Sequence, residues 1–139
     1  MNFNLPDTAS RVELHTNLNV NNKIAAETLD NIENYSYKDT NEIKSRIEEL
    51  NKEWDIERVL ETNAASVVIL STLLGFTVSK KWFYLSGIAG GFLLQHALQG
   101  WCPPVPLFRR LGVRTCSEIN YEKEQLKNHG DVSFGTMEK

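Results

Sequence analysis

Residues 63–101 read NAASVVILSTLLGFTVSKKWFYLSGIAGGFLLQHALQGW, and their only charges are Lys80 and Lys81. The uncharged run from Thr62 to Ser79 would extend about 27 Å as a helix, and the run from Trp82 to Trp101 about 30 Å. Both lengths suit the hydrocarbon core of a bilayer. The stretch predicts a hairpin of two transmembrane helices with a tight turn between them. A buried hairpin in a soluble helical oligomer is the alternative, since the first run is short for a span.

Around this hairpin, the 139 residues divide into three parts. We expect an acidic helical N-terminal region at 1–62, the hairpin at 63–101, and at 102–139 a Cys-Pro interfacial segment, a short helix and a disordered tail. The fold class is therefore all-α. Residues 1–62 hold 7 basic and 13 acidic side chains, and residues 102–139 hold 6 and 5. No basic cluster suited to binding nucleic acid is present.

Helical periodicity organises the N-terminal region. Residues 1–22 are polar and are expected to form an irregular arm without a secretory signal, and apolar spacing after Asn22 predicts a helix that ends near Ser36. Asp39 and Glu42 resemble a capping box. The helix that follows carries an apolar seam, which we expect to pack against a partner or another copy: Ile43, Ile47, Leu50 and Trp54.

The segment after the hairpin begins with prolines. Pro103, Pro104 and Pro106 must end the second helix, because proline lacks a backbone donor. A short turn containing Leu107, Phe108 and Leu111 is then predicted at the membrane surface, with Arg109 and Arg110 toward anionic headgroups. Thr115 and Glu118 form a capping box that opens a helix to about Asn128, and the tail from His129 is expected to be disordered.

Aromatic and basic residues predict how the hairpin sits in the bilayer. Trp82, Tyr84 and Trp101 flank the apolar runs, as aromatic side chains do at membrane interfaces. Five basic residues lie close to the outer ends of the hairpin against two in its turn: Lys52, Arg58, Arg109, Arg110 and Arg114 against Lys80 and Lys81. The positive-inside rule therefore places both termini in the cytoplasm.

Small residues recur at four-residue spacing inside both runs. They form the pairs Ser71 and Gly75, Ser86 and Gly90, and Gly87 and Gly91. Such pairs let helix backbones approach closely in lipid, although glycine is also tolerated in membrane helices without a packing role. We expect helix packing and a homo-oligomer, from a dimer to a larger ring.

The residues Gly100-Trp101-Cys102-Pro103, with Leu107, Phe108, Leu111, Gly112, Thr115 and Cys116, resemble a family of small bacterial inner-membrane proteins of unknown function. The same hairpin is similar to one fused to rhodanese-type sulfurtransferase domains. The chain departs from the family pattern by inserting Pro104-Val105-Pro106 and by Phe108 in place of Tyr. The resemblance implies the bacterial inner membrane and a hairpin that dimerises. The residues before the hairpin lack cysteine and do not resemble a rhodanese domain.

Three side chains are candidates for a thiol or polar site: Cys102, Cys116 and His96. Arg109 and Arg110 would lower the pKa of Cys102 if they folded back, but no general base accompanies the thiol. A small apolar residue at a membrane boundary is the simpler interpretation of Cys102, and a hydrogen bond across helices that of His96. Cys102 and Cys116 could form a disulfide, but in the cytoplasm both thiols would be kept reduced.

These patterns indicate a structural or interaction protein of the membrane, and no enzyme. We expect the lipid bilayer and further copies of the chain as partners, with a possible protein partner on the N-terminal helices. No catalytic, cofactor or metal residues are predicted, and no cofactor. The alternative is a membrane protein that handles sulfur through its thiols or passes a small solute.

Overall fold

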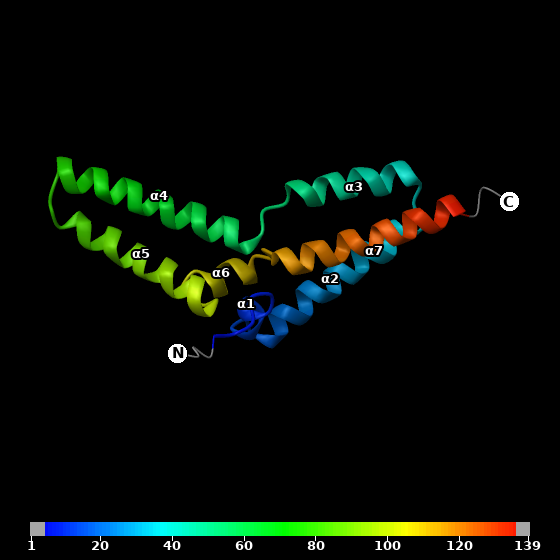
Figure 1. Ribbon diagram of the computed structural model, residues 1–139, viewed down its shortest axis with the longest axis horizontal. Helices are drawn as coiled ribbons and strands as arrows, with labels where there is room; N and C mark the ends of the chain where they lie inside the picture. The colour runs from blue at the N-terminus through cyan, green and yellow to red at the C-terminus, as the bar shows by residue number, and fades with distance from the viewer. Residues whose placement is uncertain (1–4, 136–139) are drawn as a thin grey trace.

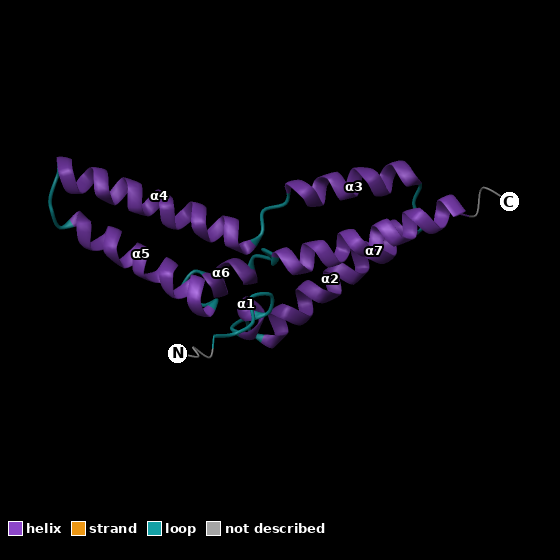
Figure 2. Ribbon diagram, in the orientation of Figure 1, coloured by secondary structure: helices purple, strands orange, loops and turns teal. Residues whose placement is uncertain are grey.

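The computed structural model describes residues 5–135, which contain helices and no strand, as the apolar runs and the helical periodicity predict (Figures 1 and 2). The all-α fold class is confirmed. The helices are α1 (Arg11–Leu14), α2 (Leu18–Ser36), α3 (Thr40–Lys52), α4 (Ile56–Thr77), α5 (Trp82–Gln99), α6 (Val105–Arg110) and α7 (Cys116–Gly135). Figure 1 shows two parts arranged end to end, a hairpin of α4 and α5 and a helical body of α2, α3 and α7, with α1 and α6 at their junction.

The hairpin forms because α4 and α5 run antiparallel, joined by a short turn at Ser79, Lys80 and Lys81. Asp55 caps α4, since its carboxylate accepts the backbone N–H of Arg58 at 2.9 Å. The first hairpin helix thus begins at Ile56, before the predicted boundary at residue 63. At the other end, Gly100 closes α5 in the left-handed conformation, with φ 74°.

Apolar side chains cover the outside of the hairpin. Ile69, Leu70 and Phe76 on α4 are 59%, 60% and 79% exposed. Within the described residues, one helical segment, Thr40–Thr77, is long and apolar enough to cross a membrane, and only 17% of its apolar window is buried. The apolar stretch of this segment belongs to α4, because α3 is rich in charged residues. A second crossing by α5 stays a prediction.

The helical body packs α2 and α3 against α7. Its apolar core consists of Ile43, Leu50, Ile119 and Leu126, bordered by Tyr35 and Ile47. The apolar seam predicted on α3 is buried through Ile43 and Leu50 and bordered by Ile47, but it packs against α7 of the same chain and not against a partner or another copy. The prediction that Trp54 continues this seam is wrong. Trp54 lies beyond the end of α3 and is 47% exposed, with the guanidinium of Arg58 4.5 Å from its ring centre.

A buried charge network ties the body to the start of the hairpin. Glu122 on α7 is fully buried and accepts hydrogen bonds from Arg46, at 3.0 Å, and from Arg114. Arg114 also forms a bidentate pair with Glu53, at 2.8 and 2.5 Å. This pairing explains why α3 ends at Lys52, because Glu53 must leave the helix in an extended conformation to reach Arg114.

Two further helix boundaries differ from the predictions. α2 begins at Leu18, with Asn17 as its cap, so part of the expected irregular arm is helical. α7 begins at the predicted capping box, in which Thr115 and Glu118 bond reciprocally, but it continues to Gly135. The expected disordered tail from His129 is therefore corrected as far as Gly135, and its remainder, 136–139, lies outside the described residues.

Candidate functional site

The base of the hairpin, where α1, α4, α5 and α6 meet, collects most of the residues that the sequence singles out. Its core consists of Val12, Ile56, Leu60, Cys102 and Val105, with Phe108 and Val113 packed against it. The second hairpin helix ends before the prolines, as predicted, and α6 starts at Val105. Each cluster member is at most 4% exposed. The junction is therefore a rigid platform from which side chains can be positioned.

A polar triad links three elements within this platform. Nε2 of His96, on α5, lies 2.7 Å from Oε2 of Glu57 on α4. Arg11, on α1, reaches the other oxygen of Glu57 at 2.9 Å and donates to the carbonyl of Ala97 at 2.8 Å. His96 is only 2% exposed, and its hydrogen bond joins the two hairpin helices.

Sequence reasoning found His96 but neither Glu57 nor Arg11. Glu57 carries a usable signal, because it is an acidic residue shortly before a long uncharged run. Arg11 carries none, since it lies far from the hairpin in sequence. Its backbone packs against Gly100 so closely that a Cβ there would lie 2.7 Å from the Arg11 carbonyl carbon. The arm thus docks where Gly100 ends α5.

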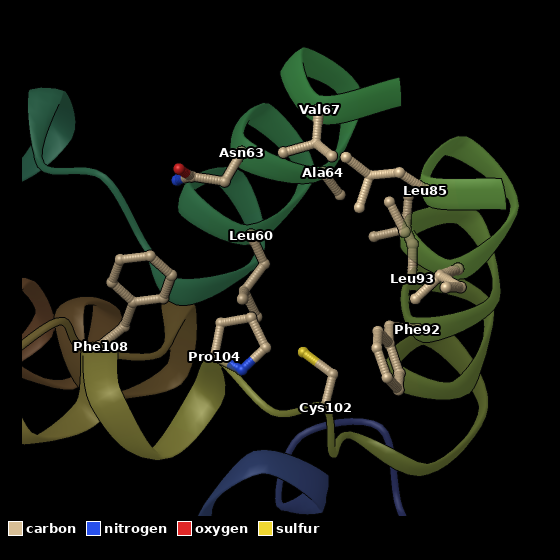
Figure 3. Close-up of a pocket in the computed structure, with 12 residues that line it drawn as sticks. Leu60, Asn63, Ala64, Val67, Leu85, Phe92, Leu93, Cys102, Pro104 and Phe108 are labelled. Carbon is tan, nitrogen blue, oxygen red and sulfur yellow. The ribbon is translucent and has the colours of Figure 1, made fainter. Parts of the chain in front are cut away.

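The two cysteines are in different environments. Cys102 is 4% exposed, and Figure 3 shows its sulfur directed into the space between α4 and α5. Burial raises the pKa of the Cys102 thiol, and nearby Glu57 raises it further, although a backbone hydrogen bond from Val105 acts in the opposite direction. Cys116 is exposed at the start of α7, and its sulfur accepts a hydrogen bond from Asn120 at 3.3 Å. Both thiols are free.

Arg109 does not project toward headgroups, contrary to the sequence prediction. It is 1% exposed and pairs with both carboxylate oxygens of Glu118, at 2.6 and 2.7 Å. The physical reason is that a guanidinium matches a carboxylate in bidentate geometry, and Glu118 faces it from the first turn of α7. Arg109 is therefore not available to activate Cys102. Arg110, by contrast, is exposed, as are Leu107 and Leu111.

The small residues divide into an inner and an outer set. Ser71 and Gly75 are buried, and a Cβ at Gly75 would meet the Phe83 ring at 2.7 Å. Ser86 faces α4, where its hydroxyl lies 3.0 Å from that of Thr72. The outer set is Gly87, Gly90 and Gly91, and a Cβ at any of them would meet no atom within 4 Å. Three of the six predicted packing residues are thus buried or in contact across the hairpin, and the other three face open space.

The predicted interface aromatics lie at both ends of the hairpin. Trp82 and Tyr84 follow the turn and are 38% and 77% exposed, whereas Trp101 is half-buried at the base. Within residues 5–135 no group of His, Cys, Asp and Glu side chains is arranged to hold a metal ion.

Comparison with known proteins supports the membrane assignment. Residues 55–118 match the family model described as the transmembrane domain of YgaP-like inner membrane proteins, a range that runs from the cap of α4 to the first turn of α7. No curated protein and no solved structure matches the chain. The matched range contains the hairpin, both cysteines, and Glu57, His96 and Arg109. Residues 55–118 of this chain are therefore similar to the transmembrane domains of YgaP-like inner membrane proteins.

Proposed function

We propose that this chain is a structural or interaction protein of the inner membrane that self-associates through its glycine face, defined as Gly87, Gly90 and Gly91 on α5. The observation that carries the proposal is the empty space over all three glycines, in contrast to Gly75, which is covered by Phe83. Lipid provides no hydrophobic drive for helix association, so close backbone packing over small residues becomes the favourable contact. A second copy of α5 would find such a surface here.

The symmetry of the expected contact follows from its chemistry. The glycine face presents the same residues on every copy, so two copies related by a two-fold axis can cover each other's glycines. Gly87 and Gly91 have the spacing of a G-x-x-x-G pair, which allows the closest approach. A dimer is therefore the smallest assembly in which the glycine face of each copy is covered.

We further propose that α4 and α5 both cross the bilayer and that both termini are cytoplasmic. The turn between the helices is short, so α5 must return toward the side where α4 started. Basic residues near the outer ends of the hairpin outnumber the two lysines in the turn, which favours this orientation.

In this orientation the helical body would face the cytoplasm and present α2 to a protein partner. Leu18, Leu29 and Tyr37 of this region are 70%, 55% and 85% exposed. The proposed role is non-catalytic, and it uses the chain as a membrane-held interaction module. Cys102 supports this view, because a buried thiol with a raised pKa is a poor nucleophile at neutral pH.

The test is the oligomeric size of the full chain in nanodiscs, measured by light scattering with the lipid contribution subtracted. We compare the wild type with Gly87→Leu and Gly91→Leu, and with Ala65→Leu as a matched control on the exposed surface of α4. A defined oligomer is expected for the wild type and for the control, and monomers for both glycine variants. A monomeric wild type, or an oligomer that survives both glycine substitutions, contradicts the proposal.

A further inference from the structure

A cavity of about 350 Å³ lies at the base of the hairpin (Figure 3). Its walls come from α4, through Leu60 and Val67, and from α5, through Leu85 and Phe92. Its floor is formed by Cys102 and by residues of α6 and the turn before it. None of the proposed self-association residues lines it, so it is a separate feature of the hairpin.

The cavity exists because small side chains stand where larger ones would fill it. Ala64 on α4 and Ala89 on α5 both line it, and both are half-buried. Protein interiors are close-packed, with few voids larger than a water molecule, whereas ligand pockets are typically about 300–1,000 Å³. The size of this space is that of a binding site.

The lining selects an apolar occupant. No charged side chain lines the cavity, and its single amide, Asn63, is already engaged, since its Nδ2 donates to the Val59 carbonyl at 2.8 Å. An ionic or strongly polar solute would lose its hydration here without gaining hydrogen bonds. The occupant must therefore be a hydrocarbon chain or another apolar group.

The position of the opening identifies the source of that chain. Val67, Leu85 and Ile88 line the cavity and are themselves 39%, 40% and 55% exposed on the hairpin surface. The cavity is thus continuous with the apolar surface that the bilayer contacts. Its floor is closed by the buried Cys102 and by Pro104 and Phe108.

From these observations we infer that the cavity binds one acyl chain of a membrane phospholipid. The phosphate of the lipid would lie beyond the base of the hairpin, on the side of α6. The helix α6 supplies Phe108 to the cavity and ends with the exposed Arg110, a cation suited to a phosphate group. The bound lipid fills the space between the two hairpin helices and α6, and so becomes part of the packing.

The experiment uses the full chain, purified in detergent, delipidated, and supplied with palmitoyl-oleoyl phosphatidylglycerol. Native mass spectrometry counts the lipids that remain bound to each chain. Ala89→Phe and Ala64→Phe place an aromatic ring inside the cavity. Ala65→Phe is the matched control, because it makes the same change at the next position of α4, which is exposed and does not line the cavity.

We expect one retained lipid per chain in the wild type and in Ala65→Phe, and an at least tenfold lower occupancy in the two filling variants. Equal occupancy in all four proteins, or no retained lipid in the wild type, overturns the inference. A change in oligomeric size with unchanged lipid count in Ala89→Phe also overturns it, because a second copy of the chain would then be the occupant.

A second measurement does not depend on how well the filling variants fold. Phe92→Trp, in a chain whose Trp54, Trp82 and Trp101 are replaced by Phe, places one fluorophore on the cavity wall. With about one brominated phospholipid per chain, phospholipids brominated near the chain end should quench it more strongly than they quench Leu94→Trp in the same background, since Leu94 lies at a similar depth, is exposed and does not line the cavity. Equal quenching argues against the site. The inference is independent of self-association, since Gly87→Leu should change the oligomer and leave the lipid count unchanged.

Discussion

Replacing Arg109 by Met tests whether this arginine is a buried structural group or a headgroup contact. Arg109 donates to both oxygens of Glu118, to the Val113 carbonyl at 3.1 Å and to Asn21 at 3.0 Å. Methionine leaves Glu118, whose side chain is 17% exposed, without its guanidinium partner. Removing one partner of such a buried pair costs about 3–5 kcal/mol. Arg110→Met removes an exposed cation next to it and should change stability by no more than about 0.5 kcal/mol.

The assay is hydrogen exchange in nanodiscs, followed at the amides of Ile119, Asn120 and Tyr121, which belong to the first hydrogen-bonded turn of α7. A loss of about 3–5 kcal/mol should raise their exchange rates by roughly two to three and a half orders of magnitude in Arg109→Met, because each 1.4 kcal/mol is a factor of ten. Arg110→Met should leave these rates within threefold of the wild type. Equal protection in the two variants, or weaker protection in Arg110→Met, would refute the assignment of Arg109 to the junction.

Three further predictions concern the same junction and the hairpin. Burial raises the pKa of Glu118, but its hydrogen bonds with Arg109 and Thr115 outweigh this and hold the pKa below its usual 4.5. The pairing therefore stabilises the fold above about pH 4.5 and loses this effect as the pH falls through the lowered pKa. In Glu118→Gln, the melting temperature should fall less steeply than in the wild type as the solution is acidified below about pH 4.5. An unchanged dependence of the melting temperature on acid pH would exclude Glu118 as its source. In N-ethylmaleimide labelling read by mass spectrometry, Cys116 should react at least tenfold faster than the buried Cys102, and the reverse order would contradict the described burial. Gly75→Leu should destabilise the hairpin by about 1–3 kcal/mol through collision with Phe83, measured by unfolding in mixed micelles, whereas Ala65→Leu, at an exposed position of α4 outside the glycine face, should have an effect near zero.

The sequence alone predicts the fold class and most helices because the signals for these features are local. The uncharged run before Ser79, the cap at Asp39 and the reciprocal pair of Thr115 and Glu118 each depend on residues close in the chain. The helix α2 begins earlier than the sequence predicts, because the asparagine-rich stretch before it offers several residues that can cap a helix. The side chain of Asn17 is the one that accepts a backbone hydrogen bond.

The candidate site was less predictable because its contacts join distant positions. Arg11 and Glu57 are 46 residues apart, and Arg114 and Glu53 are 61 apart. No periodicity marks such pairs. Arg109 and Arg110 are neighbours of the same type, and only the arrangement of α6 against α7 determines that one is buried and the other exposed. The cavity escaped prediction because it depends on what two facing helices leave unfilled.

The two sides of α5 carry different kinds of small side chain, and this difference is the basis of the two roles proposed for the helix. Its inner side carries Ser86, Ala89 and His96, which bond across to α4 or line the cavity, while its outer side carries the glycine face. In water a helix is oriented by the contrast between apolar and polar faces, but in lipid that contrast is weak. The inner side is instead fixed by two hydrogen bonds, one near each end of α5, between Ser86 and Thr72 and between His96 and Glu57. Because these bonds set the rotation of α5, they also determine that the glycines face away from α4, which is the orientation that the proposed self-association requires.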